Sequence, residues 1–306
     1  MKTAVLFLVF NRPDTTVRVF ETIRQARPPR LYVAADGPRK NRTDENEKCE
    51  KTRSVIKQID WNCEVKTLFR NENLGCGKAV SEAITWFFDQ EEEGIILEDD
   101  VLPHSDFFSY CEELLEKYRD TEQVGFISGR NNLYGDRVSD DSYFFSPINH
   151  VWGWATWRRT WKLYQFDIRN IPFSKFEKIV NEYYDEKKVR RYWSLVYKMM
   201  KYNLIDTWDY QLSIILYMNR IYSIVPNINM IQNLGLGENA THTVTVDYRE
   251  KNYSGKSILP LMHPQEICVN KLGLRKEVEF ERLYVSLKGY YYVLLRLYLK
   301  KMKNNE

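Results

Sequence analysis

Four short apolar segments in the first hundred residues each end in polar or glycine-containing sequence. They cover residues 4–10, 31–35, 65–69 and 94–97. Apolar runs of this length, bounded by turn residues, are typical of buried strands. The segments between them have the apolar spacing of helices, and strands that alternate with helices form a largely parallel sheet. We therefore predict an α/β fold with a mostly parallel, Rossmann-like central sheet flanked by helices.

The fourth apolar segment ends in three consecutive acids, Glu98, Asp99 and Asp100. In open α/β sheets, ligands bind outside the carboxyl ends of the strands. Clustered carboxylates repel one another unless a cation or several hydrogen-bond donors share them, and hard divalent cations take oxygen ligands. The triplet therefore indicates a divalent metal site. Considered by itself, a solvated acidic turn is the alternative.

The composition excludes several classes of protein. A chain of 306 residues with 43% hydrophobic residues can form one large or two modest domains. The net charge of +3 gives no reason to expect a nucleic-acid partner. The five cysteines contain no Cys-x-x-Cys pair, so neither a disulfide framework nor a zinc site is expected, and a cytoplasmic location fits best. No apolar run is long enough to cross a bilayer.

Two further strand ends carry residues suited to a nucleotide. Asp36 follows the second strand beside a Gly-Pro turn, where its carboxylate can accept a hydrogen bond from a base or ribose; a simple turn residue is the alternative. Residues 73–78 combine Asn73 and two glycines with Lys78 at the start of a helix, which suits a phosphate group. The spacing is not that of a Walker loop, and an ordinary turn with a surface lysine remains open.

Residues 151–161 contain four tryptophans. Core packing accounts for two of them, whereas indoles beside glycine and arginine form platforms on which sugar rings and nucleobases stack. We expect at least one indole to face a ligand and assign Trp154 to the ligand-binding site. Arg130, in the polar loop after a further predicted strand at 124–128, is assigned to the same site.

The second half of the chain offers two more candidate groups. Residues 174–203 are predicted to be helical, and Thr207 to cap a following apolar helix whose first turn carries Asp209. Asp209 either complements the helix dipole or acts as a general base on a rigid element. His242 ends a glycine-rich loop and is either structural, a metal ligand or a contact to a diphosphate.

The end of the chain is basic. Residues 282–303 place Leu, Val and Tyr on one side of a predicted helix and Lys or Arg on the other. Such a basic amphipathic helix suits an anionic membrane surface, and a plain surface helix docked on the domain is the alternative. We divide the chain into an α/β half (1–130), an aromatic-rich half of the same domain (131–245) and a C-terminal extension (246–306).

In their order and spacing, these motifs resemble those of glycosyltransferases of the nucleotide-diphospho-sugar transferase (GT-A) superfamily. The resemblance is to bacterial surface-polysaccharide enzymes of the family 2-like or haemolytic-protein-like type, and more weakly to the N-acetylglucosaminyltransferase I type. The motifs are Leu-Val-Phe-Asn-Arg-Pro at 8–13, Ala-Asp-Gly-Pro at 35–38, Asn-Leu-Gly at 73–75, Leu-Glu-Asp-Asp at 97–100, Gly-Trp-Ala-Thr-Trp-Arg-Arg at 153–159, Trp-Asp-Tyr-Gln at 208–211 and the loop ending Ala-Thr-His-Thr at 237–243.

The resemblance implies roles for the acid triplet. It takes the place of the family's D-x-D motif, although the first residue here is Glu. Asp100 is then expected to bind Mn²⁺ or Mg²⁺ directly, while Glu98 and Asp99 contact metal-bound waters or the ribose. The cation would bridge the donor diphosphate and neutralise charge on the leaving nucleotide.

The resemblance also implies that Asn11, Arg12 and Asp36 line the nucleotide pocket, and that Asp209 is the carboxylate base of an inverting enzyme. Residues 1–130 would then be the nucleotide-sugar-binding half, and residues 131–245 the acceptor-binding and catalytic half. We therefore expect a metal-dependent inverting glycosyltransferase. It would move a sugar from a nucleotide-sugar donor, with a UDP-linked donor favoured, to a hydroxyl of a lipid-linked or surface-polysaccharide acceptor. Peripheral contact with the inner face of the cell membrane, through the C-terminal helix, is an open alternative to a purely cytoplasmic location.

Two other functions are compatible with such a fold. A sugar-phosphate nucleotidyltransferase needs a glycine-rich, basic loop after the first strand, and Phe10-Asn11-Arg12-Pro13 stands there instead. A non-catalytic carbohydrate-binding or membrane-scaffold protein has the same fold without the chemistry, and fold alone does not separate it from an enzyme. The acids at 98–100 and 209 argue against it.

Overall fold

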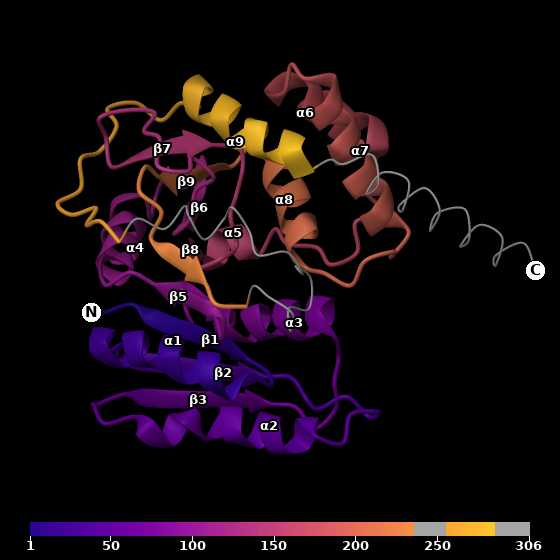
Figure 1. Cartoon of the computed structure of the whole chain (residues 1–306). Helices are drawn as coiled ribbons and strands as arrows, with labels where there is room; N and C mark the ends of the chain where they lie inside the picture. Colours follow the sequence, from indigo (N-terminus) through magenta and orange to yellow (C-terminus); the bar gives the residue numbers. More distant parts are fainter. Residues whose placement is uncertain (236–254, 285–306) are drawn as a thin grey trace, which may run out of the picture.

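The computed structural model of this chain describes residues 1–235 and 255–284. One large sheet runs through the molecule and carries helices along its length (Figure 1). Its strands are β1 (Ala4–Val9), β2 (Arg30–Ala35), β3 (Glu64–Phe69), β4 (Glu93–Glu98), β6 (Val124–Ser128), β7 (Tyr143–Ser146), β8 (Trp154–Trp157) and β9 (Tyr222–Pro226). They follow the order β3-β2-β1-β4-β8-β6-β9-β7.

The first four strands form a parallel half-sheet in which β1 pairs with both β2 and β4. Helices α1 (Pro13–Ala26), α2 (Glu45–Arg53) and α3 (Cys76–Phe88) connect them, and a short 3₁₀ helix, η1 (Ser54–Gln58), extends α2. The predicted alternation of strands and helices is confirmed, as is the fold class of a mostly parallel sheet flanked by helices.

The alternating side chains of β1 explain why this half needs helices on both faces. Val5 and Phe7 pack into one cluster with Phe20 of α1, while Leu6 packs into a second cluster with Phe87 of α3. Every residue of β1 is buried. Strands buried on both faces have near-continuous apolar sequences, which is why these strands could be found from sequence.

The Trp-rich segment contributes β8, a strand that the sequence did not predict. β8 lies between β4 and β6 and is antiparallel to both. β9 then pairs in parallel with β6, and β7 forms the antiparallel edge. Because β8 joins the two halves, the sheet is continuous across residue 130. The division into nucleotide and acceptor halves remains a prediction about function.

A second, two-stranded sheet lies beside the end of β4. It pairs β5 (Val101–Pro103) antiparallel with β10 (Ile231–Asn233). The segment that directly follows the acid triplet is thereby fixed against a segment more than a hundred residues later in the chain.

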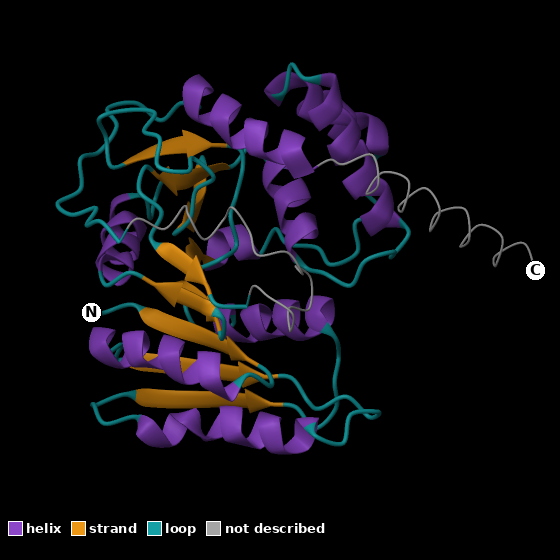
Figure 2. Cartoon of the chain, in the orientation of Figure 1, coloured by secondary structure: helices purple, strands orange, loops and turns teal. Residues whose placement is uncertain are grey.

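The remaining helices gather mostly over the later strands (Figure 2). They are α4 (Asp106–Lys117), α5 (Arg158–Trp161), α6 (Phe173–Tyr183), α7 (Lys187–Lys201), α8 (Asp209–Met218) and α9 (Lys271–Tyr284). Residues 174–203, predicted to be helical, form two separate helices, α6 and α7. Tyr184, between them, is buried and its hydroxyl is hydrogen-bonded to that of Tyr217 at 2.5 Å, so the chain turns there to close a shared apolar cluster.

Most of the predicted basic amphipathic helix lies outside the described residues, as does the loop with His242. The described chain continues to residue 284 as α9, which packs against α7 and β7. Within residues 1–235 and 255–284, no helix is long and apolar enough to cross a membrane.

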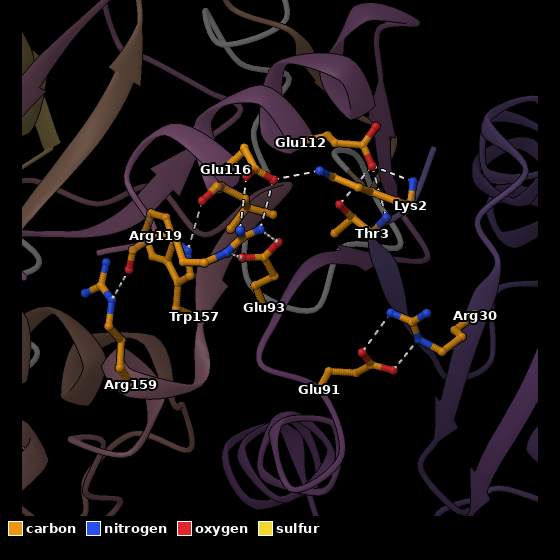
Figure 3. A network of polar contacts seen from close by, with 11 residues as sticks. Lys2, Thr3, Arg30, Glu91, Glu93, Glu112, Glu116, Arg119, Trp157 and Arg159 are labelled. Atoms are coloured by element: carbon orange, nitrogen blue, oxygen red, sulfur yellow. Dashed lines mark hydrogen bonds and ion pairs between the residues drawn. The ribbon is translucent and has the colours of Figure 1, made fainter. Parts of the chain in front are cut away.

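At the amino ends of the parallel strands, acids are paired with bases (Figure 3). Glu91 accepts two hydrogen bonds from Arg30, at 2.7 and 3.0 Å. Glu93, the first residue of β4, accepts two from Arg119, at 3.0 and 2.9 Å. Lys2 reaches Glu116 of α4 at 2.6 Å. This edge of the sheet is therefore closed by matched charges.

Candidate functional site

The acid triplet lies at the carboxyl end of β4, beside the carboxyl end of its parallel neighbour β1. The loop after β1 supplies the groups that hold the acids. The Phe10 N–H donates to Asp99 Oδ2 at 2.9 Å, and the Arg12 guanidinium pairs with the carboxylate of Asp100. Arg12 also approaches Asp99 at 3.5 Å. The adjacency of β1 and β4 thus places Arg12 and the acids together at the carboxyl ends of these two parallel strands.

The acids at this edge outnumber their counter-charge. Burial raises the pKa of Glu98 and of Asp99, and the charge of Asp100 raises both further. Arg12 acts in the opposite direction on both. Burial lowers the pKa of Arg12, but the charges of Asp100 and Asp99 outweigh that effect and raise it. A second cation would relieve the remaining repulsion.

A divalent cation at the acid triplet would need a substrate to supply most of its ligands. Among residues 1–235 and 255–284, no three His, Cys, Asp or Glu side chains are arranged to hold a metal by themselves. Mg²⁺ is commonly bound by one or two carboxylates together with substrate phosphates and water. Asp100, beside the buried Asp99 and the partly buried Glu98, is a suitable carboxylate for such an ion. His242, the other predicted metal ligand, lies outside the described residues.

The chain packs closely over Asp100. Its carbonyl oxygen accepts a hydrogen bond from the Leu234 N–H at 2.7 Å. A Cβ at Gly235 would lie 2.1 Å from the Asp100 carboxylate. Glycine at position 235 therefore permits the backbone to approach the acid, and the segment after β10 covers one side of the triplet.

Asp36 and Asn73, both predicted to contact the nucleotide, are bonded to each other. The Asn73 amide donates to Asp36 Oδ2 at 2.9 Å, and the N–H groups of Leu74 and Gly75 donate to the same carboxylate at 3.0 and 3.2 Å. Burial raises the pKa of Asp36, and these hydrogen bonds act against that effect. Asp36 therefore fixes the loop before α3.

Two further predicted residues lie at the rim of this region. Asn11 donates a hydrogen bond to Glu45 at 3.2 Å. Lys78, in the first turn of α3, is exposed and lies 3.7 Å from Glu82. Neither distance separates a nucleotide contact from a structural role, so both assignments remain predictions.

Asp209 is the first residue of α8, with Trp208 rather than Thr207 at the cap position. Its carboxylate accepts hydrogen bonds from the Tyr210 N–H at 2.9 Å and from the Thr207 hydroxyl. The charge of Asp209 contributes to the raised pKa of Glu98. The candidate base and the acid triplet therefore act on each other electrostatically, although they come from opposite halves of the chain.

Sequence reasoning missed Asp206, which belongs to the segment before α8 and contacts the first turn of α3. Its Oδ1 accepts the Gly77 N–H at 2.9 Å. Cys76, the first residue of α3, lies close enough to these acids for their charges to act on its thiol. Although Cys76 is exposed as a residue, desolvation of its thiol and the charges of Glu98, Asp206, Asp209 and Asp100 raise its pKa. The only signal in the sequence was the pair of glycines at a helix start.

The predicted ligand-facing position of Trp154 is wrong. Trp154 is 1% exposed and stacks against Phe126 and Trp208, at centroid distances of 4.8 and 5.7 Å. Its position on the central strand β8 directs it into the core. Arg130, 7% exposed, lies instead over Trp152, with 3.9 Å from the guanidinium carbon to the ring centroid. Trp152 is only partly buried.

No protein-family model matches this sequence, and none of the curated proteins matches it. Among solved structures, the chain is similar to residues 1–349 of TarS from S. aureus, with 11% identity, 53% of this chain and 48% of that chain covered, and a TM-score of 0.38. It is also similar to HddC from Yersinia pseudotuberculosis, with 13% identity, 53% and 80% coverage and a TM-score of 0.33.

A UDP-glucose pyrophosphorylase complexed with UDP-glucose matches at 10% identity, with 53% and 79% coverage and a TM-score of 0.32. The chain spans about half the length of the TarS structure. TM-scores and identities this low carry no conclusion about function. The description of the fold therefore rests on the strand order and pairing given above.

Proposed function

We propose that this chain is a metal-dependent glycosyltransferase that uses a nucleotide-sugar donor. The observation that carries the proposal is that Asp209, held at the start of α8, acts electrostatically on Glu98 of the acid triplet. Strand-end acids suited to a donor diphosphate and its cation lie within electrostatic reach of a separate carboxylate at the start of α8. A transferase needs both of these: one group to stabilise the leaving nucleotide and another to activate the acceptor.

In this proposal, the chain's own residues have divided roles. Asp100 would hold Mn²⁺ or Mg²⁺, and the ion would supply charge stabilisation at the donor diphosphate. Glu98 and Asp99 would position the donor, and Arg12 would keep the triplet's geometry until the donor arrives. Asp209 would accept the proton of the acceptor hydroxyl, which makes inversion the expected stereochemistry.

Asp209 is suited to this role by its position. It lies in the first turn of a helix, a rigid element that fixes its backbone. The Thr207 hydroxyl and the Tyr210 N–H both donate to its Oδ1. These hydrogen bonds orient the carboxylate, and a general base must be held in place to reach the proton that it removes.

A nucleotidyltransferase is the second candidate, and the loop after β1 disfavours it. That loop is short, contains no glycine, and leads into α1 at Pro13. A triphosphate-binding loop needs several backbone N–H groups free to face the phosphates. The loop here instead uses the Phe10 N–H to hold Asp99.

The proposal has three further parts. The donor is UDP-linked, the acceptor is a lipid-linked or surface glycan, and the C-terminal segment contacts a membrane. A panel of nucleotide sugars, each with and without Mn²⁺, tests its first part. We expect one donor to raise the melting temperature in the presence of Mn²⁺, since a ligand of the folded state stabilises it by mass action. We also expect slow donor hydrolysis when no acceptor is present.

The outcome that contradicts the proposal is a complete absence of both binding and hydrolysis across the panel. Binding of a donor without hydrolysis or transfer to any glycan acceptor would favour the non-catalytic carbohydrate-binding protein. Release of pyrophosphate from a nucleoside triphosphate and a sugar phosphate would favour the nucleotidyltransferase.

A further inference from the structure

We propose that Asp206 is a positioning residue: it pins the segment before α8 to the start of α3 and so holds Asp209 toward the acid triplet. This inference rests on the proposed function, since it assigns Asp206 a part in the same transfer reaction. Asp206 would touch neither donor nor acceptor. Its effect would pass through Thr207 to Asp209.

The first observation is a helix cap supplied from the other half of the chain. The first N–H groups of a helix have no partner within the helix, and a side-chain oxygen normally accepts from one of them. The N-cap of α3 is Gly75, which has no side chain to do so. Asp206 Oδ1 accepts the Gly77 N–H instead, at 2.9 Å and across 129 residues of sequence.

The second observation is the close approach that two glycines allow. A Cβ at Gly77 would lie 2.6 Å from Asp206 Oδ1 and 2.8 Å from the Thr207 carbonyl oxygen. A Cβ at Gly75, where φ is +82°, would lie 2.5 Å from Asp206 Oδ2. Any larger residue at either position would push residues 206 and 207 away from α3.

The third observation is the link from this contact to the candidate base. The Thr207 hydroxyl donates to the Asp209 carboxylate. The Thr207 carbonyl oxygen accepts from the Gln211 side chain at 2.8 Å. Thr207 is therefore hydrogen-bonded to α8 through both its hydroxyl and its carbonyl oxygen. Asp206, the residue immediately before it, is hydrogen-bonded to α3. A shift of residue 206 would move the base with it.

The contact joins two parts of the site that must act together. In the loop before α3, the N–H groups of Leu74 and Gly75 donate to the carboxylate of Asp36, which follows β2. Asp206 then ties that same loop to the segment carrying Asp209. Because a misplacement of about 1 Å can cost about 100-fold in rate, the expected consequence of losing this tie is a loss of turnover.

Kinetics of Asp206→Ala and Asp206→Asn test the proposal. For Asp206→Ala we expect kcat to fall about 10- to 100-fold while the donor KM changes less than about twofold. Asp206→Asn should recover most of the activity, because the amide oxygen can still accept the Gly77 N–H. Asp167→Ala, which removes another exposed acid of the same half that pairs with Arg169, is the matched control and should behave as wild type.

Gly77→Ala disturbs the same contact by changing its partner on α3, and it leaves every acid in place. We expect it to lower kcat as Asp206→Ala does, so the test survives if the Asp206 variant folds poorly. Hydrogen exchange supplies a readout that does not depend on activity. Amides of residues 76–79 and 207–210 should exchange faster in Asp206→Ala than in wild type and Asp167→Ala.

Two results would overturn the inference: an unchanged kcat in both Asp206→Ala and Gly77→Ala, or unchanged exchange at both segments. An equal loss in Asp206→Asn and Asp206→Ala, with donor KM raised in parallel, would also overturn it and indicate direct donor contact. If the wild-type protein transfers no sugar, the proposed function fails by itself, and the exchange result decides whether the contact between the two segments exists.

Discussion

The two edges of the parallel half-sheet are both rich in acids, yet they differ in how those acids are neutralised. At the amino edge, Glu91 and Glu93 each accept two hydrogen bonds from an arginine (Figure 3). At the carboxyl edge, Asp99 and Asp100 both pair with the same residue, Arg12. Glu93 and Glu98 begin and end the same strand, β4.

This difference separates a structural use of charge from a functional one. Matched pairs need no ligand, and single exposed pairs contribute little to stability. Buried acids with raised pKa values are costly to the folded protein and are typical of functional sites. The carboxyl edge is therefore where a cation or an anionic donor with its cation would improve the energy of the folded state.

The largest effect is expected for a substitution of the candidate base, Asp209. Asp209→Asn keeps the shape of the side chain and removes its ability to accept a proton. We expect kcat to fall about 100- to 10,000-fold, the range associated with general base catalysis, while Mn²⁺-dependent donor binding is retained. Steady-state transfer assays and thermal shift with donor measure the two quantities. Turnover equal to that of wild type would remove Asp209 as the base.

The next effect concerns the cation. Asp100→Ala removes the carboxylate proposed to hold the metal, so we expect the stabilisation by donor with Mn²⁺ to disappear. At a donor concentration about 100 times Kd, that stabilisation is about 2.7 kcal/mol in the wild type. Glu93→Gln is the matched control, because it alters an acid at the opposite edge. A full Mn²⁺-dependent shift in Asp100→Ala would exclude Asp100 as a metal ligand.

Much of this contrast could be predicted from the sequence, and the reasons are local. Strands buried on both faces are continuous apolar runs, so β1, β2 and β4 were identifiable, as was the triplet that ends β4. Arg12 and the triplet were expected at one edge, because the carboxyl ends of parallel strands meet there. These inferences needed only neighbouring residues and the rule that strands alternate with helices.

What could not be predicted depends on pairings between distant segments. The insertion of β8 between β4 and β6 buries Trp154, and nothing within residues 151–161 reveals which strand lies on either side. Asp206 reads as an ordinary turn acid until the fold brings it to Gly77. Asp36 and Asn73 each suit a nucleotide, yet both are engaged with the loop before α3.

A smaller effect should appear in the pH dependence of stability without ligand. The folded state raises the pKa of Glu98, so the unfolded chain binds fewer protons between the ordinary carboxyl pKa and the raised one. The contribution of protonated Glu98 to the free energy of unfolding is then fully present below the ordinary pKa, and it is lost as the pH rises through the raised value. Glu98→Gln removes this loss.

We therefore expect Glu98→Gln to melt about 2 °C or more above wild type near pH 8, with a smaller gain near pH 5. Glu93→Gln loses the charge pair with Arg119, although its amide oxygen can still accept one hydrogen bond, and should show no gain at either pH. Differential scanning calorimetry at several pH values measures both variants. A gain for Glu98→Gln that does not depend on pH would contradict the explanation by charge.

The smallest effect is expected at the amino edge. Arg30→Gln removes the ion pair with Glu91, but the Tyr32 hydroxyl still donates to that carboxylate at 2.8 Å. Because Arg30 is partly exposed, we expect a loss of about 1 kcal/mol or less in the free energy of unfolding, measured by urea denaturation. Donor binding and kcat should be unchanged, since the matched charges here serve packing alone. A change in Mn²⁺-dependent donor binding would mean that the two edges are coupled through the strands, and the separation between structural and functional charge would then be wrong.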